Sequence, residues 1–185
     1  LDVACQILGT GELSRFYQSL FYGKKLVTDI SGGLYIPQDP GLAFFQADFE
    51  EPSKMLEILQ GWLDEVTRLA HDGPTDEELR RVIVNAESEK LYALGSADGI
   101  AGRVGSLRFV MDDLDYDRKY IERLREVDAQ CIRDVVVRYF TPSRLSVVVL
   151  MPKGRKGEVD REAIREIALK TLPKPETSEI GRAHV

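Results

Sequence analysis

The sequence has few of the residues that form disulfide bonds or bind zinc, with two cysteines and two histidines in 185 residues. So few cysteines exclude a disulfide scaffold, and 15 glycines exclude a collagen-like chain. Cys5 and Cys131 both lie in apolar surroundings, so we expect two small buried side chains. Whether they ever pair in an oxidising compartment stays open.

The sequence also lacks a long hydrophobic run and an excess of positive charge. No apolar stretch approaches the roughly 20 residues that a membrane-spanning helix needs. Lys and Arg number 25 against 31 Asp and Glu, and the net charge of −6 is opposite to that of a general nucleic-acid binder. We therefore expect no membrane span and no nucleic-acid partner. With 43% hydrophobic residues, the chain can bury one sizeable core.

The remaining polar residues form no recognisable catalytic or metal centre. A zinc site needs three or four clustered ligands, whereas His71 is expected at a helix end and His184 lies in the tail. A Cys–His nucleophile pair would require a cysteine inside a predicted helix to reach one of these histidines. Adjacent carboxylates such as Asp112 and Asp113 point apart on a helix and are ordinarily solvated. We predict no catalytic residue, no metal ligand and no cofactor in this segment.

Hydrophobic spacing predicts a helical chain interrupted by a hairpin and one late strand. Apolar residues three and four apart indicate helices, alternation indicates strands, and the run LSVVVLM is apolar on both faces, as in a central strand. The helices are expected over 1–8, 12–22, 53–71, 75–94, 98–111, 116–125, 128–140 and 159–170, and the strands over 26–36, 42–49 and 145–151.

Turn and capping residues support these boundaries. Residues 37–41 (PQDPG) are a dense turn cluster and predict a hairpin between the first two strands. Thr75 and Glu78 have the spacing of a capping box, and Asp98 and Asp128 are expected to begin later helices.

Strands do not alternate one-for-one with helices, so we predict an α+β fold with an antiparallel sheet and a layer of helices on one face. The helical stripe expected against the sheet comprises Leu59, Trp62, Val66, Ile83 and Val136. We assign residues 1–172 to one domain and residues 173–185, which are Pro-rich and polar at their start, to a linker or tail.

Several stretches resemble one known family. The run LDVACQILGTGELSRFYQSL resembles the opening of the second domain of the pitrilysin/insulinase zinc peptidases, the M16 family, where a helix ends in a Gly-rich break before a Ser-Arg helix. Three more stretches fit in order: DPGLAFFQADFEEPSK, GPTDEELRR and VDAQCIRDVVVRYFTPSRLSVVVLMP. The likeness covers roughly residues 1–152. The matching positions of the first run are Gly9, Gly11, Ser14, Arg15, Phe16 and Tyr17.

The resemblance implies an M16-like α+β domain that packs against a zinc-bearing first domain. Two such units, in the same chain or in separate subunits, would close around a chamber that binds a peptide substrate. Family members hold zinc with an H-x-x-E-H helix and a later Glu. No H-x-x-E-H is present here, so zinc is expected in a domain that precedes this chain.

The departures from the family pattern indicate a non-catalytic copy of the domain. Catalytically contributing versions carry an Arg after the Ser-Arg helix and a Tyr seven residues later, and Phe21 and Thr28 stand at those positions here. Neither side chain donates the charge-assisted hydrogen bonds of an Arg. We therefore take Phe21 and Thr28 as candidate chamber-facing residues. The competing expectation is that Phe21 belongs to the core.

Two functions stay open at this stage. The first is a non-catalytic, chamber-forming domain of a zinc-dependent metalloendopeptidase. The second is a domain of a pseudopeptidase scaffold or assembly subunit without proteolytic activity. Whether the parent protein is an enzyme depends on an H-x-x-E-H outside this chain. The compartment is likewise open between the periplasm and the cytoplasm of a bacterium.

Overall fold

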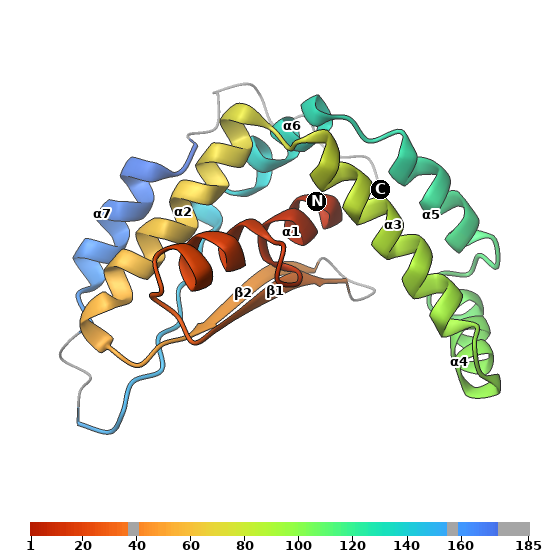
Figure 1. Ribbon diagram of the computed structural model, residues 1–185, viewed down its shortest axis with the longest axis horizontal. Coiled ribbons are helices and arrows are strands. Elements are labelled where there is room, and N and C mark those ends of the chain that lie inside the picture. The colour runs from red at the N-terminus through yellow and green to blue at the C-terminus, as the bar shows by residue number, and fades with distance from the viewer. Residues whose placement is uncertain (37–40, 155–158, 174–185) are drawn as a thin grey trace.

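Two short strands and a larger set of helices make up the computed structural model, which describes residues 1–36, 41–154 and 159–173 (Figure 1). The α-helices are α1 (Asp2–Gly9), α2 (Met55–Asp72), α3 (Asp76–Ala93), α4 (Ala97–Phe109), α5 (Tyr116–Arg125), α6 (Ala129–Tyr139) and α7 (Arg161–Thr171). A π-helix, η1 (Tyr17–Gly23), precedes the strands β1 (Asp29–Tyr35) and β2 (Leu42–Asp48). Two 3-10 turns, η2 (Pro52–Lys54) and η3 (Pro142–Arg144), complete the described elements. The fold is mostly helical with a small antiparallel sheet, which confirms the predicted fold class.

The sheet is an antiparallel pair whose inner face lies against α1. Its register runs from Asp29 opposite Asp48 to Tyr35 opposite Leu42. The alternation of side chains along β2 places Phe45 on the face toward α1, where its ring lies against Gly9. Gly32 permits this packing, since a Cβ there would come within 2.1 Å of Cδ1 of Phe45. The ring of Phe45 therefore occupies the space that a side chain on β1 would need.

The helices form further layers on that same side of the sheet. Figure 1 shows α1 along the sheet, α2 and α7 to one side, and α3, α4 and α5 extending to the other. The buried ring of Phe16 connects the layers, with its centroid 4.9 Å from that of Phe45 and 6.2 Å from that of Trp62. The expectation that the sheet packs directly on the stripe of α2, α3 and α6 therefore needs correction. Helix α1 and Phe16 lie between the sheet and that stripe, because α1 supplies a fully apolar face.

The prediction of a third strand over 145–151 is wrong. The segment follows η3 as extended chain but pairs with no strand of the described residues, and the sheet there contains only β1 and β2. Val148 is 84% and Leu150 91% exposed, whereas Val147 packs against the core. Apolarity on both faces predicted burial on both faces, yet a strand also needs a neighbouring backbone, and the described sheet does not supply one.

Several smaller predictions are also settled. The capping box of Thr75 and Glu78 is present, and the Asp128 side chain accepts from the Cys131 amide at 2.7 Å. Ser96, not Asp98, caps α4 by accepting from the Gly99 amide at 3.0 Å. Cys131 is exposed rather than buried.

The helix expected over 12–22 begins later than predicted. It starts at residue 15 and continues as η1. Residues 37–40 of the predicted turn, and 174–185 of the predicted linker or tail, lie outside the described residues.

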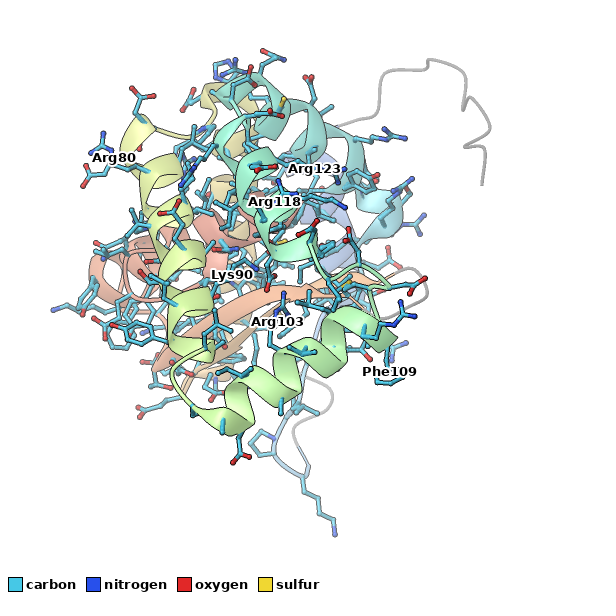
Figure 2. All side chains as sticks on the ribbon, turned by 90° about the vertical axis from the view of Figure 1, so that its right-hand side faces the viewer. Arg80, Lys90, Arg103, Phe109, Arg118 and Arg123 are labelled. Carbon is cyan, nitrogen blue, oxygen red and sulfur yellow. The ribbon has the colours of Figure 1, made fainter. Side chains whose placement is uncertain are left out.

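Helices α3, α4 and α5 form an arm held together by a charged cluster. Figure 2 shows Lys90 of α3 and Arg103 of α4 close together beside α5. Both bind Asp117 of α5, Lys90 Nζ at 2.5 Å from Oδ1 and Arg103 Nε at 2.7 Å from Oδ2. Hydrogen bonding by Arg103, and then by Lys90, lowers the pKa of Asp117 to about 2. A single carboxylate thus joins all three helices.

Across the described residues, none of the helices combines the length and the apolar character that crossing a bilayer requires.

Candidate functional site

The candidate site is an open cavity of about 430 Å³ between the end of η1 and the start of β1. Its lining consists of Phe21, Tyr22, Lys25, Val27 and Thr28. The structure therefore brings together Phe21 and Thr28, the two residues chosen from the sequence, across the end of a helix and the start of a strand.

The unusual path of η1 shapes this cavity. Its π-type turn ends with the Lys24 amide donating to the Ser19 carbonyl at 2.8 Å, and the Leu26 amide donates to the Leu20 carbonyl at 2.9 Å. Leu20 is fully buried, and a Cβ on Gly61 of α2 would come within 2.5 Å of its Cδ2. Glycine at that position lets η1 dock closely on α2. Single π-turns of this kind occur frequently at functional sites.

The chain leaves η1 through a left-handed residue. Lys25 has φ of 53°, a conformation that side chains other than Gly, Asn and Asp adopt rarely. It is exposed, while the next two residues, Leu26 and Val27, are buried. The left-handed turn therefore reverses the chain so that it enters the core immediately after a charged residue at the cavity. Backbone strain of this kind concentrates at functional sites.

An aromatic cluster forms one wall of the cavity. The ring centroid of Phe21 lies 4.6 Å from that of Tyr17 and 5.2 Å from that of Tyr22. Tyr22 is 51% exposed, and Phe21 is half-buried at the edge of the core. Phe21 is thus neither a fully buried core residue nor a free surface residue. One part of its ring packs on the protein and another part faces the cavity.

Thr28 has a structural hydrogen bond as well as a place in the lining. Its amide and its Oγ1 both donate to the Asp48 carbonyl, at 2.7 and 3.1 Å, which extends the pairing of β1 with β2. The hydroxyl is therefore engaged, and Phe21 has no polar atom in its side chain. Neither residue supplies a charged hydrogen-bond donor.

Sequence reasoning missed Tyr22, Lys25 and Val27, the other residues of the lining. The aromatic spacing pointed to a helix face, but the widened turn of η1 changes which side chains share that face. A left-handed backbone at a lysine has no sequence signal of its own. The only hint was Gly23 before two adjacent lysines, which marks the end of a helix.

The rest of the described chain offers no cluster suited to metal. No group of three or more His, Cys, Asp or Glu side chains lies close enough to hold an ion within the described ranges. His71 is exposed and pairs with the neighbouring Asp72 carboxylate, at 2.6 Å between Nδ1 and Oδ1. Burial raises the pKa of the Cys5 thiol to about 12. The side chains of the described ranges therefore do not fit a zinc site.

Comparison with known proteins gives a sequence match over part of the chain and a fold for most of it. Residues 1–85 match the family described as the peptidase M16 inactive domain. None of the curated proteins matches the chain.

Among solved structures, a "putative zinc protease" from Bordetella pertussis Tohama I aligns with a TM-score of 0.68 and 22% identity, over 82% of this chain and 83% of that one. The peptidase M16 inactive domain from Pseudomonas fluorescens aligns with a TM-score of 0.63 and 18% identity, over 72% of this chain and 32% of that one. A protease from Helicobacter pylori aligns with a TM-score of 0.63 and 21% identity, over 76% of this chain and 34% of that one.

At these identities the structural likeness concerns the fold, and the chain spans about a third of the Pseudomonas and Helicobacter proteins. The sequence match covers α1, η1, the hairpin, α2 and the first half of α3. It therefore includes every residue that lines the cavity. Residues 1–85 thus match the peptidase M16 inactive domain in sequence, and most of the chain has the fold of solved structures that include a peptidase M16 inactive domain.

Proposed function

We infer that this chain is a non-catalytic, chamber-forming domain of a zinc-dependent metalloendopeptidase that cleaves peptides. In this proposal zinc belongs to a preceding domain, and a second M16 unit, in the same chain or in another subunit, closes the chamber. The match to the M16 inactive domain supports this assignment, as does the larger size of two structural neighbours. Residues 1–172 would form the domain and 173–185 a linker or tail toward further sequence.

The observation that carries the proposal is the chemistry of the cavity. Aromatic and aliphatic surface lines it, and the hydroxyl of Thr28 is already bonded to β2. Such a surface holds an apolar part of a peptide equally well before and during the reaction. It therefore contributes uniform binding rather than transition-state stabilisation. Phe21 and Thr28 would face the chamber, with Phe21 as the main contact.

The test is Phe21→Ala in the complete protein that contains this chain, assayed on a peptide that it cleaves. A chamber role predicts a raised KM, a kcat that is nearly unchanged and a small loss of stability, since the ring is only partly in the core. Phe109→Ala is the matched control, because it makes the same substitution at a side chain that is 87% exposed on α4 (Figure 2).

Three results would contradict the proposal. A large fall in kcat with stability kept would give this domain a part in the chemistry. A loss of roughly 3–5 kcal/mol in unfolding free energy, with normal kinetics of the folded fraction, would make Phe21 a core residue. A complete protein without H-x-x-E-H and without peptidase activity would favour the pseudopeptidase scaffold instead.

A further inference from the structure

The cavity beside η1 combines apolar walls with one positive charge. Phe21, Tyr22 and Val27 supply aromatic and aliphatic surface, and Lys25 is the only charged residue of the lining. Lys25 is exposed and forms no ion pair with another described residue. The adjacent Lys24 is exposed as well but does not belong to the lining, since its Nζ lies near Gly61 of α2.

The neighbouring carboxylates do not neutralise this charge within the protein. Glu12 and Asp29 are nearby carboxylates, and each adds to the effect of burial in raising the pKa of Tyr17. Neither of them forms an ion pair with Lys25 in the described chain. The ammonium group of Lys25 is therefore available to a ligand at the rim of the apolar surface.

The backbone of Lys25 has an uncommon conformation between two structured segments. Its left-handed φ of 53° lies between the π-turn and two buried residues, Leu26 and Val27. A lysine is an unfavourable residue for that conformation, where glycine costs less. A strained residue that also lines a cavity is a candidate for a role in binding.

We propose that this cavity binds peptide segments in which a large apolar side chain is followed or preceded by a carboxylate. The apolar side chain lies against Phe21, Tyr22 and Val27, and the carboxylate pairs with Lys25. This inference rests on the proposed function, because it names the class of peptide that the chamber surface selects. The positive charge of Lys25 makes the cavity electrostatically complementary to such a peptide. An acidic residue beside the apolar one is attracted to Lys25, and a basic residue there is repelled by it.

The expected selectivity is modest because Lys25 is exposed. A solvent-exposed ion pair corresponds to at most about fivefold in a dissociation constant. Repulsion of a basic peptide increases the difference in dissociation constant between the acidic and the basic peptide. High salt reduces that difference.

The experiment measures dissociation constants by fluorescence anisotropy on the complete protein, with a chelator present to prevent cleavage. Four labelled peptides differ only in a central pair: Phe-Glu, Phe-Gln, Phe-Lys and Gly-Glu. We expect Phe-Glu to bind tightest, Phe-Lys weakest among the three Phe peptides, and Gly-Glu to lose most of the affinity. Lys25→Glu should reverse the order of Phe-Glu and Phe-Lys. Lys153→Glu, the same charge change at another exposed lysine, should leave the order unchanged.

Lys25→Gly keeps the experiment decisive if the charge reversal disturbs folding. Glycine suits the left-handed backbone, so this variant should fold and should bind the three Phe peptides with equal affinity. If Lys25→Gly binds all three Phe peptides and still prefers Phe-Glu over Phe-Lys, the role of Lys25 is overturned and the proposed function stays intact. Absence of binding for every peptide, in a complete protein that also cleaves none, would overturn both.

Discussion

Replacing Arg15 by alanine removes an ion pair that joins the helical turn before η1 to Glu78 of α3. The guanidinium donates from Nε to Glu78 Oε1 at 2.7 Å and from one terminal nitrogen to Glu78 Oε2 at 2.9 Å. That same nitrogen donates to the Gly73 carbonyl at 2.8 Å. The two side chains are only 10% and 15% exposed, so this is a nearly buried pair rather than a surface contact.

Breaking one partner of a buried pair costs roughly 3–5 kcal/mol, because the other charge is left without its partner. We expect the lower end, about 3 kcal/mol, since Glu78 still accepts from the Thr75 amide at 2.8 Å. In a chain of this size that corresponds to a fall in Tm of roughly 6–12 °C. Arg118→Ala is the control, because its pairs with Asp115 and Glu122 are exposed and should contribute less than about 1 kcal/mol.

Urea unfolding followed by the fluorescence of Trp62, the single tryptophan, measures both variants. Burial raises the pKa of Glu78, but hydrogen bonds from Arg15 and Thr75 outweigh it and hold that pKa below its ordinary value. The stability from this group is therefore present above the ordinary Glu pKa of about 4.3 and is lost as pH falls through the lower folded value. Arg15→Ala should weaken that acid dependence. A cost no larger than that of Arg118→Ala, with an unchanged acid profile, would refute the reasoning.

Three other predictions concern the hairpin, the arm and the cysteines. Gly32→Ala should lower the free energy of unfolding in urea by roughly 1–3 kcal/mol, because the new Cβ would come within 2.1 Å of Phe45 Cδ1. An unchanged urea midpoint would contradict this and show that the hairpin adjusts to the added methyl group. Asp117→Asn should remove about 1–2 kcal/mol at neutral pH and flatten the loss of stability between pH 5 and 2, because the folded pKa near 2 lies below the ordinary value. In the native chain a thiol reagent should modify exposed Cys131 quickly and buried Cys5 only after unfolding, so two fast thiols would contradict the burial of Cys5.

Local features of the fold could be read from the sequence because their signals lie within a few residues. Helix α5 occupies the predicted residues 116–125, and Thr75 and Glu78 form the predicted capping box. The error at α4 is of the same local kind. Ser96 and Asp98 are both good caps two residues apart, and only the backbone geometry decides between them.

Features that depend on distant parts of the chain could not be predicted. Residues 145–151 have the composition of a central strand, but pairing requires a neighbour that the sequence of the segment does not identify. Cys131 follows the cap of α6 by three residues, and burial of Ile132 and Val136 turns it outward. The partly buried state of Phe21 likewise follows from the docking of η1 on α2.

The candidate site shows the same division. The positions of Phe21 and Thr28 came from a family resemblance, and the structure places both on one cavity. The contribution of Lys25 depends on a left-handed backbone and a π-turn, which have no residue pattern of their own.

The central claim, that this chain adds surface but no chemistry to a zinc peptidase, is tested most directly by zinc analysis after dialysis. The 185-residue chain and the complete protein would be measured side by side, together with hydrolysis of a fluorogenic peptide. The account predicts tightly held zinc and peptide hydrolysis in the complete protein, and neither in the chain alone. One tightly held zinc per 185-residue chain, or hydrolysis by that chain alone, would contradict it.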